Sequence, residues 1–358
     1  MKKTFSLLTM ALLVLSITPV VFAASVGSGI GVDIITEDFA PLVWMCDNRI
    51  VVDDATEPGR VSLDGESLVE RMNNYAFEGE QIQWNVLVMD KNGVEKIEDV
   101  FATIGDAQGE GNDIEVNCQR VGYKDNTKLP GECNAKILEE GLSYFDADVM
   151  EMYQCTFTVE TPLSMYGEYW ITVEALDLDG LSGTMDENEY WFLNPEIALS
   201  IDGDLVFEDV RPGTYSYSDT LLVGNDADDG SGVRLDMFIS GTDFYDSSSS
   251  GAMCPTTNQL SLSAFSYYVT HGAYSSSNDG RNDAEGYVPI KYGIGFNDPN
   301  PFYNVNEILQ SGPMNGPYYQ ANILSPGAEM ALTFRLDLPE PCNGDFDTGS
   351  IYFWGEAI

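Results

Sequence analysis

The stretch Gly167–Gly180, GEYWITVEALDLDG, alternates apolar with polar side chains and then ends in turn-forming residues. Its apolar positions are every second residue, namely Tyr169, Ile171, Val173 and Ala175. Successive side chains of a strand point to opposite faces, so this spacing predicts a half-buried β-strand with an exit turn at Asp177–Gly180. The same alternation recurs along the chain and predicts an all-β protein.

The residues after this strand indicate a domain boundary. Tyr190–Leu193 is followed by Asn194-Pro195, and proline cannot donate a hydrogen bond to a neighbouring strand. A new apolar alternation begins at Ile197. The chain is longer than one hydrophobic core usually encloses, so we predict two consecutive β-sandwich domains, residues 24–195 and residues 196–358.

Residues 1–23 have the composition of a cleaved signal peptide. Two lysines precede an apolar run from Leu7 to Leu15, and small residues lead up to Ala23. Polar residues and Pro19 interrupt the run before it reaches the roughly 18 apolar residues of a membrane span. We predict cleavage after Ala23 and a mature chain that is secreted, without a membrane span, to the extracellular side of the cell surface.

The chain is strongly acidic. It has 58 Asp and Glu against 16 Lys and Arg, a formal charge of −42. Nucleic acid and anionic membranes need a basic footprint, so both are excluded as partners. The charge favours cations, and an equally good interpretation is that it serves solvation at a salty or crowded surface.

The first domain contains several short segments with strand character. Leu42–Val52 and Gln81–Met89 are expected strands, and the turn residues Asp90–Gly93 make Lys96–Ile104 the expected hairpin partner of the second. Glu66–Met72 is the one segment with helical spacing. About seven short strands separated by turns resemble the immunoglobulin-like superfamily, which implies an immunoglobulin-like sandwich.

The start of the second domain carries another resemblance. The turn sequence Phe207–Thr214 is followed by an alternating strand, Asn225, and a further alternating strand up to Ser240. This arrangement resembles the opening of secreted β-sandwich fibre proteins of the camelysin and TasA family. The resemblance implies a jelly-roll-like module that polymerises outside the cell. The chain as a whole also resembles archaeal cell-surface proteins.

Six cysteines follow the leader, an even number that suits disulfides in an oxidising compartment. Pairing within domains joins Cys254 to Cys342. The other four allow three connectivities. We favour Cys118 with Cys133 across a polar loop, and Cys46 with Cys155. None of the six has the CxxC spacing of a zinc site.

No catalytic constellation is present in the sequence. His271 is the single histidine, so neither a HExxH zinc site nor a histidine-rich metal site is possible. There is no GxSxG elbow, and we interpret His271 as a solvent-exposed residue without a catalytic role. The chain is expected not to be an enzyme and to need no cofactor, with calcium as the one ion it could use.

Three acidic loops have the composition of calcium sites, because closely spaced Asp and Asn oxygens on glycine-containing loops are typical calcium ligands. None matches the EF-hand loop, and Asp-Gly turns also occur as ordinary hairpin turns. The candidate ligands are Asp226 and Asp228 in the first loop, Asn343, Asp345 and Asp347 in the second, and Asp177 and Asp179 in the third.

These features favour an exported structural or adhesive protein of the cell surface, and a subunit of a self-assembling layer or filament is one form that such a protein takes. Its expected partners are further copies of itself or other surface components. The glycine-rich segment Ser25–Ile35 is expected to pair as a strand, either with its own first domain or with the next subunit. The alternative is an extracellular carbohydrate- or ligand-binding module. Tyrosine clusters such as Tyr267-Tyr268 and Tyr318-Tyr319 suit sugar stacking and core packing equally well.

Overall fold

The computed structural model describes residues 33–53, 69–71, 74–109, 114–129, 133, 142–186, 190–295 and 305–358. Of the described residues, 48% lie in strands and 4% in helices, so this part of the protein is nearly all β and the predicted fold class is confirmed. Residues Phe39–Ile358 form one compact unit, and the boundary near Pro195 stays a prediction. The signal peptide and most of Ser25–Ile35 lie outside the described residues. No helix in the described part is long and apolar enough to cross a membrane.

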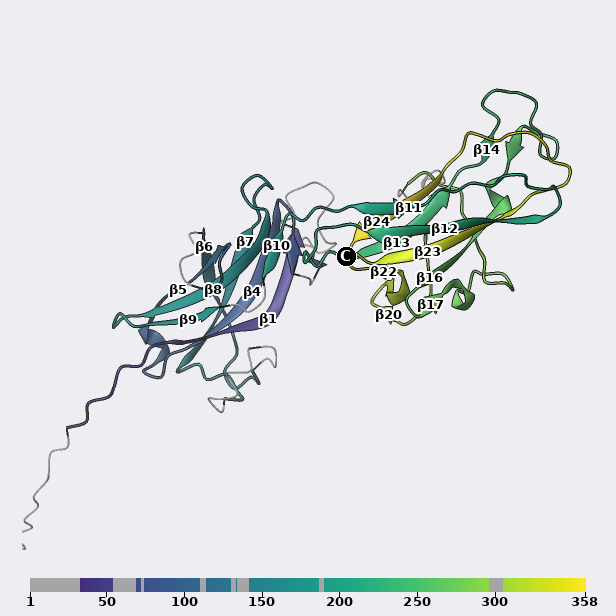
Figure 1. Ribbon diagram of the computed structural model, residues 1–358. Coiled ribbons are helices and arrows are strands. Elements are labelled where there is room, and N and C mark those ends of the chain that lie inside the picture. Colours follow the sequence, from purple (N-terminus) through teal and green to yellow (C-terminus); the bar gives the residue numbers. More distant parts are fainter. Residues whose placement is uncertain are drawn as a thin grey trace, which may run out of the picture. The chain divides into compact units, whose positions relative to one another are not determined.

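Among the described residues, the first half of this unit has a series of strands and a short 3-10 turn, several of which are labelled in Figure 1. They are β1 (Leu42–Asp53), β2 (Val69–Arg71), β3 (Tyr75–Ala76), β4 (Glu80–Met89), η1 (Val94–Lys96), β5 (Ile97–Gly105), β6 (Ile114–Val121), β7 (Met150–Thr158), β8 (Gly167–Asp177), β9 (Ser182–Asp186) and β10 (Trp191–Leu193). They form one path, β2-β1-β4-β7-β6-β5-β8-β10-β3, with β9 added to β8.

Strand β6 joins two layers of this path. Its first residues, Ile114–Asn117, pair with β5, and its last residues, Cys118–Val121, pair with β7. Alternate side chains of β1, β4 and β7 therefore face those of β5 and β8 across a shared core that includes Trp84, Ile104 and Val173. A second cluster, containing Trp44 and Met152, covers the other face of the β1-β4-β7 layer, so residues 86–89 at the end of β4 are buried on both sides.

Two local predictions in this half are wrong. Residues Asp90–Gly93 do form a turn, but η1 follows it and β5 pairs with β6 and β8 instead of β4. The turn thus carries the chain to the opposite layer. Within the predicted helix Glu66–Met72, the described residues Val69–Arg71 form strand β2 instead. They pair antiparallel with β1 at Val51 and Val52.

The first-half disulfides also differ from the prediction. Cys46 bonds Cys133, and Cys118 bonds Cys155, so both favoured pairings are wrong. Cys118 and Cys155 are directly opposite residues of the antiparallel strands β6 and β7, while Cys46 and Cys133 form an isolated β-bridge. Sheet register, and not closeness along the chain, therefore sets the pairing. Cys254 bonds Cys342 in the second half, as expected.

The second half is built from shorter elements (Figure 1). They are β11 (Leu199–Asp202), β12 (Tyr215–Asn225), β13 (Leu235–Gly241), β14 (Phe244–Tyr245), β15 (Gln259–Leu260), η3 (Leu262–Ala264), β16 (Phe265–His271), β17 (Tyr274–Ser275), η4 (Ser276–Asn278), β18 (Val288–Pro289), β19 (Asn306–Glu307), β20 (Met314–Asn315), β21 (Tyr318–Tyr319), η5 (Gln320–Asn322), β22 (Ile323–Leu324), β23 (Glu329–Asp337) and β24 (Ile351–Ala357).

Two sheets of the second half face each other across one core. The first has the order β11-β12-β23-β16-β17, with β18 paired to β16, and the second places β24, β19 and β22 on β13. Strand β23 shows why they pack: Met330, Leu332, Phe334 and Leu336 point inward and their neighbours point outward. This alternation leaves the outer face of the β12-β23-β16 sheet to polar and aromatic side chains.

Candidate functional site

Tyrosines and one arginine gather on the outer face of the β12-β23-β16 sheet. Tyr217 lies opposite Arg335 on the neighbouring strand β23, and Arg335 in turn lies opposite Ser266 on β16. Tyr215 and Tyr217 of β12 are 55% and 53% exposed, and at these positions β12 pairs with β23 but not with β11. Tyr268 of β16 is two residues beyond Ser266 and therefore shares its face.

The guanidinium of Arg335 lies between two tyrosine rings. Its central carbon is 4.9 Å from the ring centre of Tyr215 and 4.3 Å from that of Tyr287. The ring of Tyr287 is also 5.9 Å from Tyr217 and 5.8 Å from Tyr268. We call these four tyrosines, with Arg335 and the nearby Asp283 and Glu285, the tyrosine–arginine face.

Two carboxylates bind the other side of Arg335. Its Nη1 donates to Glu285 Oε2 at 2.8 Å, and its Nη2 donates to Asp283. Burial is the largest influence on the pKa of Asp283 and raises it, but the hydrogen bonds from Arg335 and from the main-chain N–H groups of Tyr287 and Glu285 outweigh it, so the pKa is lowered. The carboxylate of Asp283 therefore stays ionised at neutral pH.

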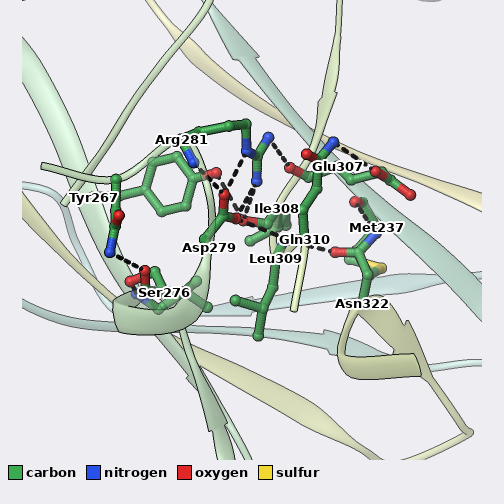
Figure 2. Close-up of polar contacts among 12 residues, drawn as sticks. Met237, Tyr267, Ser276, Asp279, Arg281, Glu307, Ile308, Leu309, Gln310 and Asn322 are labelled. Atoms are coloured by element: carbon green, nitrogen blue, oxygen red, sulfur yellow. Dashed lines mark hydrogen bonds and ion pairs between the residues drawn. The ribbon is translucent and has the colours of Figure 1, made fainter. Parts of the chain in front are cut away.

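A buried polar network around Asp279 and Arg281 is shown in Figure 2. It fixes the start of the segment that goes on to Asp283, Glu285 and Tyr287. The carboxylate of Asp279, 1% exposed, accepts from Arg281 Nε at 2.9 Å and from the main-chain N–H of Gln310 at 2.9 Å. Arg281 Nη1 donates to the Glu307 carbonyl at 2.8 Å. These bonds tie the segment after η4 to β19, so the face is built on a rigid support.

The tyrosine–arginine face has the parts that recognise a neutral polyol. Exposed phenol rings offer apolar surface for the C–H face of a sugar ring. Carboxylates accept hydrogen bonds from hydroxyls, and the guanidinium and phenol groups donate them. The arrangement can therefore bind a ligand through ring stacking and hydrogen bonds.

Sequence reasoning found one member of this face and missed the rest. Tyr268 belongs to the predicted pair Tyr267-Tyr268, whereas its neighbour Tyr267 is fully buried and donates to the Ile308 carbonyl at 2.7 Å. The spacing of Tyr215 and Tyr217 on one strand face was a usable signal. Tyr287 and Arg335 join them only through sheet pairing.

The seven predicted calcium ligands lie in separate places. Asn343, Asp345 and Asp347 line one cavity, and the other four do not. Asp177 is 2% exposed and accepts from the main-chain N–H groups of Asp179, at 2.9 Å, and Leu181, at 2.7 Å, so it closes its own turn. Asp179 pairs with Lys96 at 2.7 Å.

The loop at Asp226 and Asp228 is also engaged by the chain itself. Oδ2 of Asp228 accepts from the Tyr166 hydroxyl at 2.9 Å and from the Glu196 N–H at 2.8 Å. The main-chain N–H of Asp226 donates to the Ala198 carbonyl at 2.9 Å. Within the described residues, no three His, Cys, Asp or Glu side chains gather as a group that could hold a metal ion.

Calcium binding stays a prediction with a direct test. If the acidic loops bind the ion, millimolar calcium should raise the melting temperature of the protein at fixed ionic strength, because a ligand that binds only the folded state stabilises it. Sodium chloride at matched ionic strength is the control. Equal stabilisation by the two salts would mean that screening of the net charge is the whole effect.

His271 is half-buried and not solvent-exposed as predicted. Its Nδ1 lies 2.8 Å from the carbonyl oxygen of Ala321, a buried residue of η5. A ring nitrogen held by a buried main-chain carbonyl supports a structural position for this histidine.

Comparisons with known proteins identify no family for this chain. No family model matches the chain, and no curated protein matches it. The C-terminal domain of the AgI/II polypeptide BspA from Streptococcus agalactiae matches with 10% identity and a TM-score of 0.27, covering 89% of this chain and 97% of that one. The secreted serine protease VesC from Vibrio cholerae matches with 8% identity and a TM-score of 0.17, covering 78% of this chain and 47% of that one.

With TM-scores below 0.5, these likenesses carry no argument about function. The resemblance to archaeal surface proteins gains no support from them. The resemblance of residues 197–240 to the camelysin and TasA family likewise gains none, because no family model matches.

Proposed function

We propose that this chain is an exported adhesive protein of the cell surface that binds neutral carbohydrate through the tyrosine–arginine face. The observation that carries the proposal is the pair Tyr215 and Tyr217, more than half exposed beside Arg335 and two carboxylates. Three disulfides are typical of an extracellular protein and support the location.

An aromatic face can bind either nucleic-acid bases or sugar rings, and the net charge of the chain favours sugars. Stacked rings also suit nucleic-acid bases, but a chain with a formal charge of −42 repels a phosphate backbone. A neutral polysaccharide has no net charge, so the negative charge of the protein does not repel it. The function proposed is binding without catalysis, and self-association into a layer or filament stays a prediction.

The test is retention of the mature protein on insoluble neutral polysaccharides such as chitin, cellulose, xylan and mannan. We expect the protein to bind at least one of them. The double variant Tyr215→Ala/Tyr217→Ala should lose about tenfold or more in affinity, equal to about 1.4 kcal/mol, because two exposed stacking surfaces are removed while the core stays intact.

Tyr144→Ala is the matched control, since Tyr144 is 59% exposed on the first half of the chain. It should bind as the unchanged protein does. Circular dichroism should give the same spectrum and melting temperature for all three proteins. Absence of retention on every polysaccharide, or equal retention of the double variant, would refute the proposed function.

A further inference from the structure

The second half contains a cavity of about 530 Å³ that lies apart from the tyrosine–arginine face. None of the seven residues of that face lines it. Its size falls within the range of small-molecule sites.

The inner wall of the cavity is aromatic and apolar. Phe265, 5% exposed, forms its base, with the ring of Phe244 at 4.7 Å and that of Phe207 at 5.8 Å between centroids. Leu336 and Leu260 extend the wall, and both are at most 5% exposed. A hydrocarbon group that contacts this wall would be removed from water, which favours its binding.

The mouth of the cavity carries negative charge alone. Asp209, Asp345 and Asp347 line it, and none of its described lining residues is a lysine or arginine. The carboxylates of Asp209 and Asp345 are exposed, and within the described residues neither takes part in a hydrogen bond or ion pair. Asp347 accepts from the Ser247 hydroxyl at 2.6 Å and N–H at 2.8 Å, and these bonds lower its pKa.

The segment that holds two of these carboxylates is fixed at both ends. Asn343 exchanges main-chain hydrogen bonds with Met253 at 2.9 and 3.0 Å, directly after the Cys254–Cys342 disulfide. The Tyr245 N–H donates to the Thr348 carbonyl at 2.7 Å. Between these anchors Phe346 is half-buried against the core, while its neighbours Asp345 and Asp347 are exposed.

From this arrangement we infer that the cavity binds an organic cation, an ammonium group carried on an apolar body. The hydrocarbon body enters between Phe207, Phe244 and Phe346, and the ammonium group stays at the mouth beside Asp209 and Asp345. A carboxylate headgroup would be repelled there, and a neutral one would gain only the apolar contact. This ligand site is independent of carbohydrate binding.

Three ligands with one body and three headgroups test the inference: octylamine, octanol and octanoate, titrated into the mature protein by calorimetry at neutral pH. We expect octylamine to bind with a stoichiometry of one, octanol to bind about tenfold more weakly, and octanoate not to bind. Phe346→Ala should weaken octylamine and octanol alike, because it shortens the apolar wall that both contact.

Charge variants separate the mouth from the wall. Asp209→Asn/Asp345→Asn should weaken octylamine about tenfold and leave octanol unchanged. Asp219→Asn/Asp229→Asn removes the same charge from exposed positions outside the cavity and should change neither. The inference is overturned if no ligand binds, if octanoate binds as tightly as octylamine, or if the control pair weakens octylamine as much as the mouth pair does. All four substituted aspartates are exposed, so these variants keep the core that folding requires.

Discussion

Replacing Asp279 with alanine is expected to cost about 3 to 5 kcal/mol of the free energy of unfolding, because it leaves the Arg281 guanidinium half-buried without its partner (Figure 2). The side chain of Asp279 is fully buried and that of Arg281 is 21% exposed. Burial, the largest influence on the pKa of Asp279, raises it, yet the hydrogen bonds and charge of Arg281 outweigh burial and lower it. The ion pair is therefore intact at neutral pH.

Urea denaturation at neutral pH measures this cost. The control is Asp229→Ala, an exposed carboxylate of the same half, which should change stability by less than about 0.5 kcal/mol. A cost of Asp279→Ala below about 1 kcal/mol would equal that of a surface ion pair and would contradict a buried support. The variant should also bind carbohydrate more weakly, since the segment with Asp283 and Tyr287 loses its anchor.

Replacing Asp236 with asparagine is expected to stabilise the protein at pH 8 by about 2 to 4 kcal/mol. Asp236 is 2% exposed on β13, and burial raises the pKa of its carboxyl to about 7. The Asn322 amide donates to it at 2.7 Å and lowers the pKa, while the charges of Glu307 on β19 and Glu356 on β24 raise it further. Asparagine keeps an oxygen for Asn322 and carries no charge to bury.

The expected pH dependence follows from the direction of that shift. A carboxyl with a raised pKa in the folded state contributes stability that is fully present below its unfolded pKa, near 4. That contribution is lost as the pH rises to about 7 and stays lost above it. Unfolding free energies at pH 5 and pH 8 should therefore differ less for Asp236→Asn than for the unchanged protein. Equal differences in the two proteins would show that Asp236 titrates normally.

The alternation of side chains along single strands was predictable from the sequence. Ile171, Val173 and Ala175 are buried in β8 as their spacing indicates, and the bounds of β1 and β4 lie within one residue of the expected ones. Burial of one strand face depends on residues two positions apart, so the signal is local and the chain carries it in full.

Pairing between distant segments was not predictable in this way. The turn at Asp90–Gly93 reads as a hairpin, but the chain changes layers there because β1 and β7 occupy both edges of β4. Cys118 and Cys133 are near one another in the sequence, but they bond Cys155 and Cys46 instead, because strand pairing places those cysteines opposite them. Which strand lies beside which depends on how both layers fill their core together.

The sequence alone thus determined the all-β class and the pairing of Cys254 with Cys342, because period-two patterning and cysteine arithmetic need no partner strand. Only the tertiary structure placed Tyr217, Tyr287 and Arg335 on one face, and Phe207 with Phe346 at one cavity. These residues are far apart along the chain and come from different strands and loops. Their meeting depends on sheet register and on buried anchors such as Asp279, which are properties of the packed protein and not of any single segment.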